Sequence, residues 1–314
     1  MELRHLTTFR AVATTLSFTR AATQLGYVQS AVTSHVKALE DELGVRLFDR
    51  LGRRIALTQA GRRLLGYADE ILQLSEEAAT VVADAEEPAG PVTVSAPEVL
   101  CAYRLPPVIR RLQERHPGVR LLFRASPTGA LDTRLRRALR TGEVDVAFVL
   151  EEEIAPSDAL AVEPLSAEPL VVVAAPEHPL ARAARVTPAD LDGVPVLLTE
   201  PGCGYRRVFE RALESAGARA MVAGEFTSGE TVKRCVEAGS AIGVLAAVSV
   251  DAELVSGRLS AVRWDAPALA LTSYLVADRR RWVSPAHAAL REATHRSFAS
   301  MPETPVADVA TSPA

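Results

Sequence analysis

The first sixty residues have the hydrophobic spacing of short helices joined by tight turns. Apolar residues recur at helical spacing within residues 6–13, and Ser17 is placed to cap a second helix that ends at Leu25. Gly26 permits a sharp turn before a third helix over residues 28–43, which carries an apolar stripe along one face. Two short helices joined by such a turn predict a helix-turn-helix.

Two further elements follow the third helix. An apolar pair, a glycine-centred turn and a second apolar pair lie in residues 47–57, in the stretch LFDRLGRRIAL, and predict a small β-wing. From Thr58 the pattern predicts one long helix to about Asp84, which ends in the hinge-like segment EEPAGP at residues 86–91.

The long helix carries an apolar seam in alternating steps of four and three residues, the spacing of a coiled-coil contact. Such a seam either packs on the helix's own domain or pairs with a second chain. Because a hinge-like segment ends the helix, we favour a partner chain. The residues predicted to form this dimer contact are Leu64, Ala68, Ile71, Ala78 and Val82.

Beyond Pro91 the chain alternates strands and helices. The apolar runs that predict strands lie at 92–96, 119–125, 144–150, 170–175, 194–199, 220–226, 242–246 and 269–277. Helical stretches lie between them, for example at 104–115, 130–141, 205–216 and 230–238. Short Val- and Leu-rich runs separated by helices imply parallel sheets covered on both faces, in one large or two small α/β domains.

The charge is unevenly distributed along the chain. The 314 residues have a formal net charge of −4. Residues 1–63 hold ten Lys or Arg against five Asp or Glu, a charge of +5, which leaves −9 for the rest. A small basic module on a larger acidic body suggests a nucleic-acid partner for the first part of the chain.

Several classes of protein are excluded by what the sequence lacks. No apolar run approaches the ~18–20 residues that span a bilayer, and the N-terminus has no signal-peptide pattern, so we expect a cytoplasmic protein without membrane association. The three cysteines form no CxxC pair and the six histidines have no metal-ligand spacing. No GxGxxG, P-loop, GxSxG or HExxH motif is present. We therefore expect no catalytic site, metal or cofactor.

Five motifs keep the same order over about 60 residues near the N-terminus, and no gap is needed to align them. They read F-x-x-V from Phe9, S-F-T-x-A-A-x-x-L from Ser17, Q-S-A-V-T-x-x-V-x-x-L-E-x-x-L-G from Gln29, L-F-x-R from Leu47 and L-T-x-A-G from Leu57. This stretch resembles the winged helix-turn-helix of LysR-type transcriptional regulators. The α/β remainder resembles that family's effector-binding part, which is similar to type 2 periplasmic binding proteins. The resemblance covers almost the whole chain.

The resemblance implies an α/β protein with an N-terminal all-α winged helix-turn-helix, a long linker helix and two Rossmann-like subdomains joined by a hinge. The implied domains are a DNA-binding domain (1–58), a linker with dimerisation helix and hinge (59–90), an effector-binding domain (91–299, with subdomain I at 91–162 and 268–299 and subdomain II at 163–267) and a disordered tail (300–314).

The third helix is the implied recognition helix, whose first residues would enter the major groove of promoter DNA. Gln29 is the best candidate for reading bases, because its amide can pair bidentately with adenine. The family often has Arg at position 34, where this chain has Ser, so base preferences do not transfer. The implied DNA contacts are Val28, Gln29, Ser30, Thr33, Ser34, His35 and Lys37 on the helix, and Arg50, Arg53 and Arg54 on the wing.

The effector would bind where strands end and helices begin. Two such helix starts, at Glu98 and Tyr205, could cradle an anion, which favours an anionic effector. Glu98 either caps its helix or pairs with a cationic group of the ligand. The candidate residues are Ser95, Pro97, Glu98, Ser126, Thr128, Thr199, Gly202, Cys203, Arg206, Thr227 and Ser228.

Two of these candidates have a second interpretation. Arg206 either clamps an anion or pairs with Glu200 or Glu210. Cys203 is either a redox-active thiol or a small residue that the turn requires, and we favour the latter.

The resemblance also implies partners. Linker helices would pair two chains, and two such dimers would form a homotetramer on an interrupted inverted repeat, with RNA polymerase as a further partner. Other functions explain less of the chain: a small-molecule carrier leaves residues 1–60 without a role, and a general nucleoid protein does not need the α/β part.

Overall fold

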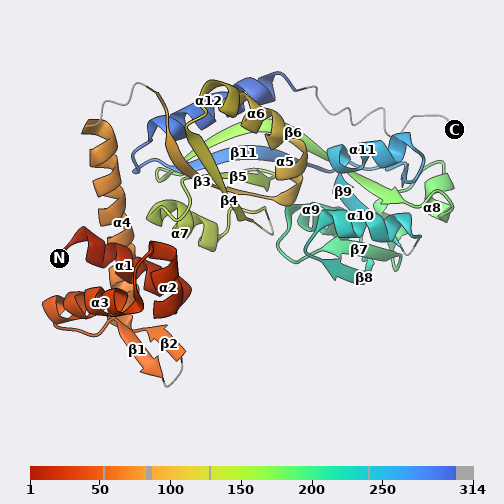
Figure 1. Cartoon of the computed structure of the whole chain (residues 1–314). Coiled ribbons are helices and arrows are strands. Elements are labelled where there is room, and N and C mark those ends of the chain that lie inside the picture. Colours follow the sequence, from red (N-terminus) through yellow and green to blue (C-terminus); the bar gives the residue numbers. More distant parts are fainter. Residues whose placement is uncertain (52–53, 83–86, 127–128, 240, 302–314) are drawn as a thin grey trace. The chain divides into compact units, whose positions relative to one another are not determined.

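The computed structural model describes residues 1–51, 54–82, 87–126, 129–239 and 241–301 (Figure 1). The chain divides into two compact units, one of residues 1–86 with 140–143 and one of residues 87–139 with 144–314. The tail beyond residue 301, expected to be disordered, lies outside the described residues. Of the helices that the structure describes, none combines the length and hydrophobicity needed to cross a membrane.

The first unit begins with the expected helix-turn-helix. Its three helices are α1 (Leu3–Thr15), α2 (Phe18–Leu25) and α3 (Gln29–Leu43). The Ser17 hydroxyl accepts the Arg20 N–H at 3.3 Å and so caps α2, while Gly26 (φ 69°) makes the left-handed turn into α3. Phe9, Val32 and other apolar residues of the three helices form one buried core.

A two-stranded wing and a long helix complete this unit. Strand β1 (Phe48–Leu51) pairs with β2 (Arg54–Leu57) in antiparallel register, and α4 covers Gln59–Val82. Glu40, on α3, holds the wing in place: its Oε1 accepts the N–H groups of Leu47 at 2.7 Å and Phe48 at 3.2 Å. The same carboxylate therefore links the third helix to the first strand of the wing.

Helix α4 uses part of the predicted seam for its own unit. Ala68 has no exposed surface and Leu64 and Ile71 are half-buried, all within the core shared with the three short helices. Ala68 therefore has no surface left for a partner chain. Ala78 is exposed, and the side chain of Val82 lies outside the described residues. Two apolar residues outside the predicted seam, Tyr67 and Leu74, are 65% and 64% exposed.

The second unit is a mixed nine-stranded sheet with helices on its faces. Its strand order is β4-β3-β5-β11-β6-β9-β7-β8, and β10 pairs with β6. The strands are β3 (Gly90–Ala96), β4 (Val119–Ala125), β5 (Val146–Glu151), β6 (Leu160–Ala174), β7 (Pro195–Thr199), β8 (Met221–Phe226), β9 (Ile242–Ala246), β10 (Ser260–Ala261) and β11 (Ala270–Asp278). The helices are α5 (Glu98–Tyr103), α6 (Leu105–Arg115), α7 (Thr133–Thr141), α8 (Pro179–Arg182), the 3-10 helix η1 (Pro188–Leu191), α9 (Gly204–Ser215), α10 (Gly229–Glu237), α11 (Ala247–Val255) and α12 (Pro285–Ala299).

Both faces of the sheet are covered at strands such as β5, as the continuous apolar runs predict, whereas the edge strands β4 and β8 are mostly exposed. In β5 the alternating residues Val146, Phe148 and Leu150 face the core that contains α6 and α12. Their neighbours Ala147 and Val149 face a separate core formed with α7. Since every residue of such a strand is buried on one side or the other, the strand loses the apolar–polar alternation of a half-exposed sheet.

The expectation of parallel sheets is confirmed for β4-β3-β5 and for β9-β7-β8, which pair in parallel, but it is wrong for the centre of the sheet. Strand β11, from near the end of the chain, pairs antiparallel with both β5 and β6, and β6 pairs antiparallel with β9. The long strand β6 contacts β11 along residues 160–169 and β9 along 170–173, so the expected subdomain boundary at 162/163 falls inside one continuous strand.

A buried ion pair joins the start of α6 to the middle of β6. The Arg104 guanidinium donates from Nε and Nη2 to both carboxylate oxygens of Glu168 at 2.8–3.1 Å, and the Ser273 hydroxyl donates to the same carboxylate at 3.2 Å. The side chains of Arg104 and Glu168 are 7% and 2% exposed. These contacts fix the junction of α5 and α6 against the two central strands.

We expect Gly61→Ala to destabilise the first unit by about 1–3 kcal/mol, because a Cβ atom there would overlap the Leu47 carbonyl oxygen. Hydrogen exchange of amides in β1 and α4 measures the effect. Gly66→Ala in the same helix, where the new methyl group meets no atom within 4 Å, is the matched control and should stabilise by about 0.5–1 kcal/mol. Equal protection in the two variants would contradict the close approach.

We expect Arg104→Met to lower the free energy of unfolding of the second unit by about 3–5 kcal/mol, since it leaves a buried carboxylate without its charged partner. Both tryptophans, Trp264 and Trp282, lie in this unit, so tryptophan fluorescence during urea unfolding reports it alone. The double variant Arg104→Met/Glu168→Leu should lose less than the single variant. A double variant that loses more would show that the pair is not the source of the effect.

Candidate DNA-binding surface and effector pocket

The first turn of α3 presents an exposed surface. Val28, which precedes the helix, is 68% exposed, and Gln29, Ser30, Ser34 and Lys37 are also exposed. The side chain of Val28 makes no cap, so the first N–H groups of the helix remain open to an outside acceptor. This part of α3 has the polar groups and the access that contact with DNA requires.

Two threonines hold this surface in place. The Thr19 hydroxyl, from α2, donates to Gln29 Oε1 at 3.3 Å and orients the amide. The half-buried Thr33 turns its hydroxyl back to the Gln29 carbonyl at 3.0 Å, which leaves its methyl group as the part available for contact. Gln29 is therefore exposed and positioned by the helix packed behind it.

His35, expected at the DNA, instead packs inside the unit. Its Nδ1 lies 3.0 Å from the Thr8 hydroxyl, and its ring lies 5.3 Å from the His5 ring and 5.6 Å from the Tyr27 ring. Burial, followed by the nearby His5 and Arg4, lowers the pKa of His35, which favours the uncharged ring. Its contacts give His35 the role of holding α3 against α1.

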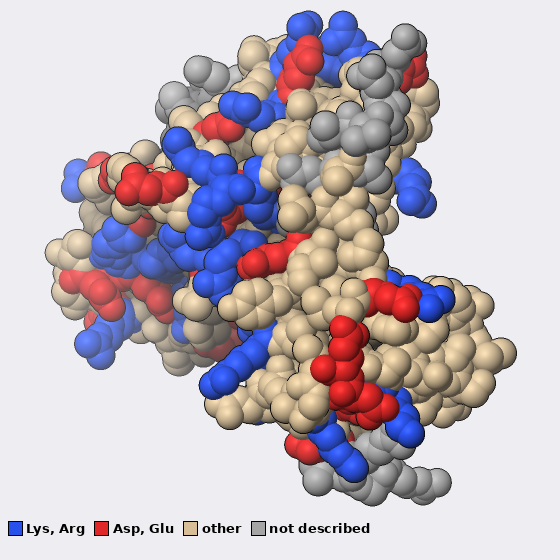
Figure 2. Space-filling view, turned by 90° about the vertical axis from the view of Figure 1, so that its left-hand side faces the viewer, with Lys and Arg blue, Asp and Glu red and all other residues tan. Residues whose placement is uncertain are grey.

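The wing arginines are only partly described. Arg53, expected at the tip, lies outside the described residues, as do the side chains of Arg50 and Arg54, whose backbones pair in β1 and β2. Basic residues also occur in the second unit, where α7 carries the exposed residues Arg134, Arg136 and Arg137. Figure 2 shows Lys and Arg side chains gathered on one face, with Asp and Glu among them.

A cavity of about 220 Å³ lies in the second unit where strands β3, β7 and β8 lead into helices α5, α9 and α10. Of the predicted effector residues, five line it: Pro97, Glu98, Thr199, Cys203 and Thr227. Four of them belong to a strand end or to the loop that follows it, and Glu98 is the first residue of α5. The cavity therefore lies at the strand ends, where the sequence places the effector.

The other predicted effector residues that the structure describes do not line the cavity. Ser95 is buried in β3, Ser126 and Gly202 lie outside the lining, and Thr128 lies outside the described residues. Ser228 caps α10, and its hydroxyl also donates to Glu98 Oε1 at 3.2 Å.

Of the two roles expected for Arg206, the structure shows pairing with a glutamate of the same chain. It donates to Glu210 at 2.7 Å, to Glu225 at 2.6 Å and to the Thr199 carbonyl at 3.3 Å, and it is absent from the lining. Its guanidinium therefore braces the loop that ends in Cys203.

Sequence reasoning missed the residues that reach the cavity from helix faces. The polar or aromatic ones are Tyr103, Tyr205, Glu230, Lys233 and Ser249, and Val99, Ala102, Gly204 and Gly229 also belong to helices. Leu150 and Leu245, which were missed as well, reach the cavity from strands β5 and β9. A Cβ at Gly204 would approach Leu271 Cδ1 to 2.7 Å and the Leu150 carbonyl oxygen to 3.2 Å, so glycine suits the close start of α9 against the central strands. The pair Glu230/Lys233, three residues apart directly after the predicted Thr227–Ser228 loop, was the available signal.

The lysine in the cavity wall is fully engaged. Lys233 Nζ donates to Glu230 Oε2 at 2.8 Å, Glu253 Oε1 at 3.1 Å and the Ser249 carbonyl at 3.0 Å, and its side chain is 5% exposed. Burial by itself would lower the pKa of Lys233, but the hydrogen bonds to Glu230 and Glu253 outweigh burial and raise it. Lys233 is therefore a charged structural link between α10 and α11.

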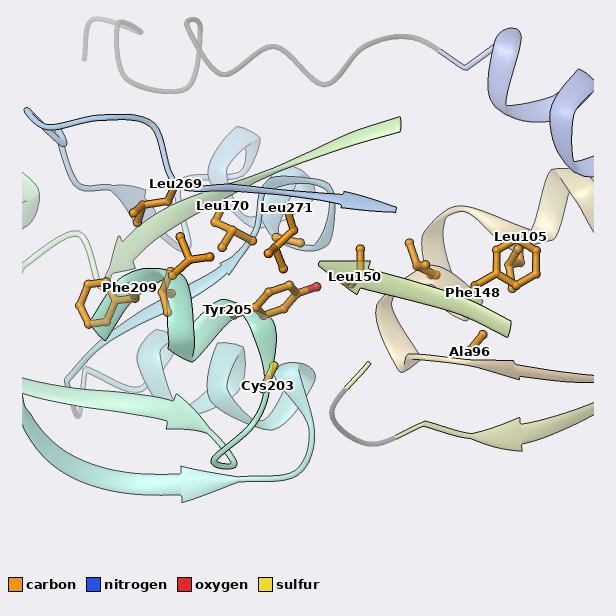
Figure 3. Packing of buried hydrophobic residues seen from close by; sticks show 14 of the residues in the cluster. Ala96, Leu105, Phe148, Leu150, Leu170, Cys203, Tyr205, Phe209, Leu269 and Leu271 are labelled. Atoms are coloured by element: carbon orange, nitrogen blue, oxygen red, sulfur yellow. The ribbon is translucent and has the colours of Figure 1, made fainter. Parts of the chain in front are cut away.

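Two hydroxyl groups in the wall lack partners. Thr199 Oγ1 and Tyr205 OH are buried, and within the described part of the chain neither has a hydrogen-bond partner. Burial, with smaller effects from Cys203, Glu168 and Glu98, raises the pKa of Tyr205 well above its ordinary value, so its phenol stays protonated. Figure 3 shows its ring below Leu271 with the hydroxyl pointing toward Leu150, and Cys203 at the start of α9.

The described residues offer no group of three His, Cys, Asp or Glu that could hold a metal ion.

Comparisons with known proteins identify both units. Residues 3–62 match the bacterial regulatory helix-turn-helix protein family of LysR type, and residues 85–299 match the LysR substrate binding domain. The chain is 37% identical over 298 residues to the uncharacterized HTH-type transcriptional regulator YwqM of Bacillus subtilis, covering 95% of this chain and 100% of that protein.

Solved structures share the fold. Full-length OxyR of Pseudomonas aeruginosa, solved as a variant, superposes with a TM-score of 0.70 at 24% identity and covers 96% of this chain and 95% of its own. Full-length CbnR in complex with its target DNA gives a TM-score of 0.66 at 22% identity and covers 95% of this chain and 100% of its own. The chain belongs to the LysR family of DNA-binding transcriptional regulators, with a helix-turn-helix and an effector-binding domain.

Proposed function

We propose that this regulator reads promoter DNA through the first turn of α3 and is switched by a small effector in the cavity beside α5, α9 and α10. The observation that carries the DNA assignment is the exposed Gln29 amide, held by Thr19 from the preceding helix. An amide fixed in this way offers a donor and an acceptor to adenine in the major groove. Val28, Ser30, Ser34 and Lys37 would contact neighbouring bases and phosphates, with the wing arginines adding phosphate contacts.

The cavity supports the second part of the proposal. Its walls come from both ends of the mixed sheet: Glu98 and Tyr103 follow β3, whereas Thr199 and Lys233 belong to the part beyond β6. A ligand that contacts both walls would favour one arrangement of the two parts over others, which is how binding shifts a conformational equilibrium. Effector binding would thereby alter how a dimer or tetramer holds its DNA-binding units.

The proposed dimer contact uses a seam shifted from the predicted one. Tyr67, Ile71, Leu74 and Ala78 continue the steps of four and three along α4, and three of them are exposed. Exposed apolar residues at heptad spacing are typical of a helix that pairs with another. Pairing of two α4 helices would give the homodimer, and two dimers the homotetramer. Such a regulator would act in the cytoplasm and affect RNA polymerase at the promoter.

We expect Gln29→Ala to lose about 1–3 kcal/mol of discrimination between the target site and unrelated DNA, because the base contact disappears. Arg53→Ala should instead weaken binding to all sequences and reduce the dependence of log K on log salt by about one. Fluorescence anisotropy with both DNAs at several salt concentrations distinguishes the two effects. Equal losses on both DNAs for Gln29→Ala would remove that residue from base reading.

We expect Leu74→Glu to convert dimers into monomers, since it puts a charge into the centre of the proposed seam. Sedimentation velocity measures the change, and circular dichroism checks that the helices remain. Glu70→Lys, at an exposed charged position of the same helix, is the matched control and should leave the dimer intact. Dimers that persist in Leu74→Glu would place the interface elsewhere.

A further inference from the structure

The cavity lining contains a positive charge, Lys233, but that charge is not available to a ligand. A lysine ammonium has three N–H donors. All three of Lys233 are used, on Glu230, Glu253 and the Ser249 carbonyl, at 2.8–3.1 Å. Among the described residues of the lining, Lys233 is the one cation. The cavity therefore has no free cation to receive an anionic group.

The unpaired charge in the lining is negative. Glu98 is exposed at the first position of α5, and its Oε1 accepts a hydrogen bond from the Ser228 hydroxyl at 3.2 Å. None of the ion pairs between described residues involves Glu98, whereas Glu230 is already paired with Lys233 and Arg234. Helix α5 has six residues and begins with this carboxylate, so its N–H groups face a negative charge of their own chain.

Two uncharged hydroxyl groups of the cavity wall have no hydrogen-bond partner among the described residues. Thr199 and Tyr205 are 7% and 6% exposed, and their hydroxyls are buried without a hydrogen bond in the described residues. A buried hydroxyl without a partner is costly, so a group that occupies this part of the wall would gain by hydrogen bonding to it. The apolar side chains of the lining are Val99, Ala102, Leu150 and Leu245.

We propose, on the basis that the effector occupies this cavity, that the effector is a small primary amine. Its ammonium group pairs with Glu98, a short apolar chain contacts Val99, Ala102 and Leu245, and a hydroxyl or similar neutral polar group bonds to Thr199 and Tyr205. The cavity of about 220 Å³ is smaller than the ~300–1,000 Å³ of sites for drug-sized ligands, which sets the size at that of a metabolite. This charge is opposite to the one that the two helix starts predict.

Two probes of matched length and opposite charge test the proposal on the full-length protein. 5-Amino-1-pentanol carries an ammonium and a hydroxyl group, and 5-hydroxypentanoate carries a carboxylate and a hydroxyl group. Ligand-observed NMR titration measures each affinity at millimolar concentrations. We expect the amine to bind and Glu98→Gln to weaken it by about tenfold or more, because a charge-assisted hydrogen bond is lost. Glu114→Gln, at an exposed residue of α6, should change nothing.

The variant Ala102→Trp fills the cavity with a large side chain and should abolish the binding of any probe there. It therefore shows whether each probe binds in the cavity. Amine binding that depends on Ala102 and Glu98 supports the proposal. Tighter binding of 5-hydroxypentanoate, amine binding that Glu98→Gln leaves unchanged, or no binding of the amine would each overturn it. If the carboxylate binds and Ala102→Trp abolishes its binding, the cavity remains the effector site and only the charge assignment fails. The DNA titrations of the Gln29 and Arg53 variants contain no effector, so they test the DNA-binding assignment independently of the effector assignment.

Discussion

The effector-binding unit depends on two long strands, β6 and β11, that lie side by side through the middle of its sheet. One end of β6 pairs with β11 next to β5, and its other end pairs with β9. The backbone hydrogen bonds of these strands therefore join both walls of the cavity into one sheet. The Arg104–Glu168 pair and Ser273 fix α5 and α6 to the same strands, so the wall that carries Glu98 has a firm base. The Glu98–Ser228 hydrogen bond then crosses the cavity at its edge, where a ligand can strengthen or replace it.

Most strands could be predicted because each is a short run rich in apolar residues, and β5, β7 and β9 are buried along nearly their whole length. Strand β6 shows the limit: only its end at 170–174 is continuously apolar, whereas its first part contains Glu163, Pro164 and Glu168. That part is a strand because β11, about a hundred residues later, pairs with it, and Glu168 is tolerated because Arg104 neutralises it. The sequence of β6 shows neither its pairing with β11 nor the neutralisation of Glu168 by Arg104. The antiparallel centre of the sheet therefore could not be predicted from the local hydrophobic pattern.

The same distinction separates the site residues that were found from those that were missed. Pro97, Glu98, Thr199, Cys203 and Thr227 follow strands directly, and topology alone brings strand ends together. Tyr103, Lys233 and Ser249 reach the cavity from helices, and which face of a helix points inward is decided by packing.

The linker helix α4 shows the same limit of prediction. Ala68 and Leu74 are both apolar, yet the smaller Ala68 is buried in its own unit and Leu74 is 64% exposed.

The charges of the effector unit show why residue type is a weak guide to ligand type. Arg206 and Lys233 are the basic residues nearest to the cavity loops, and each satisfies glutamates and a backbone carbonyl of its own chain. A buried cation must be paired in this way to be stable, and a paired cation has little left to offer a ligand. Glu98 is different because it is an exposed residue of the cavity lining and takes part in none of the ion pairs between described residues. An anion there would meet an uncompensated carboxylate, and this repulsion contributes to specificity as much as any attraction.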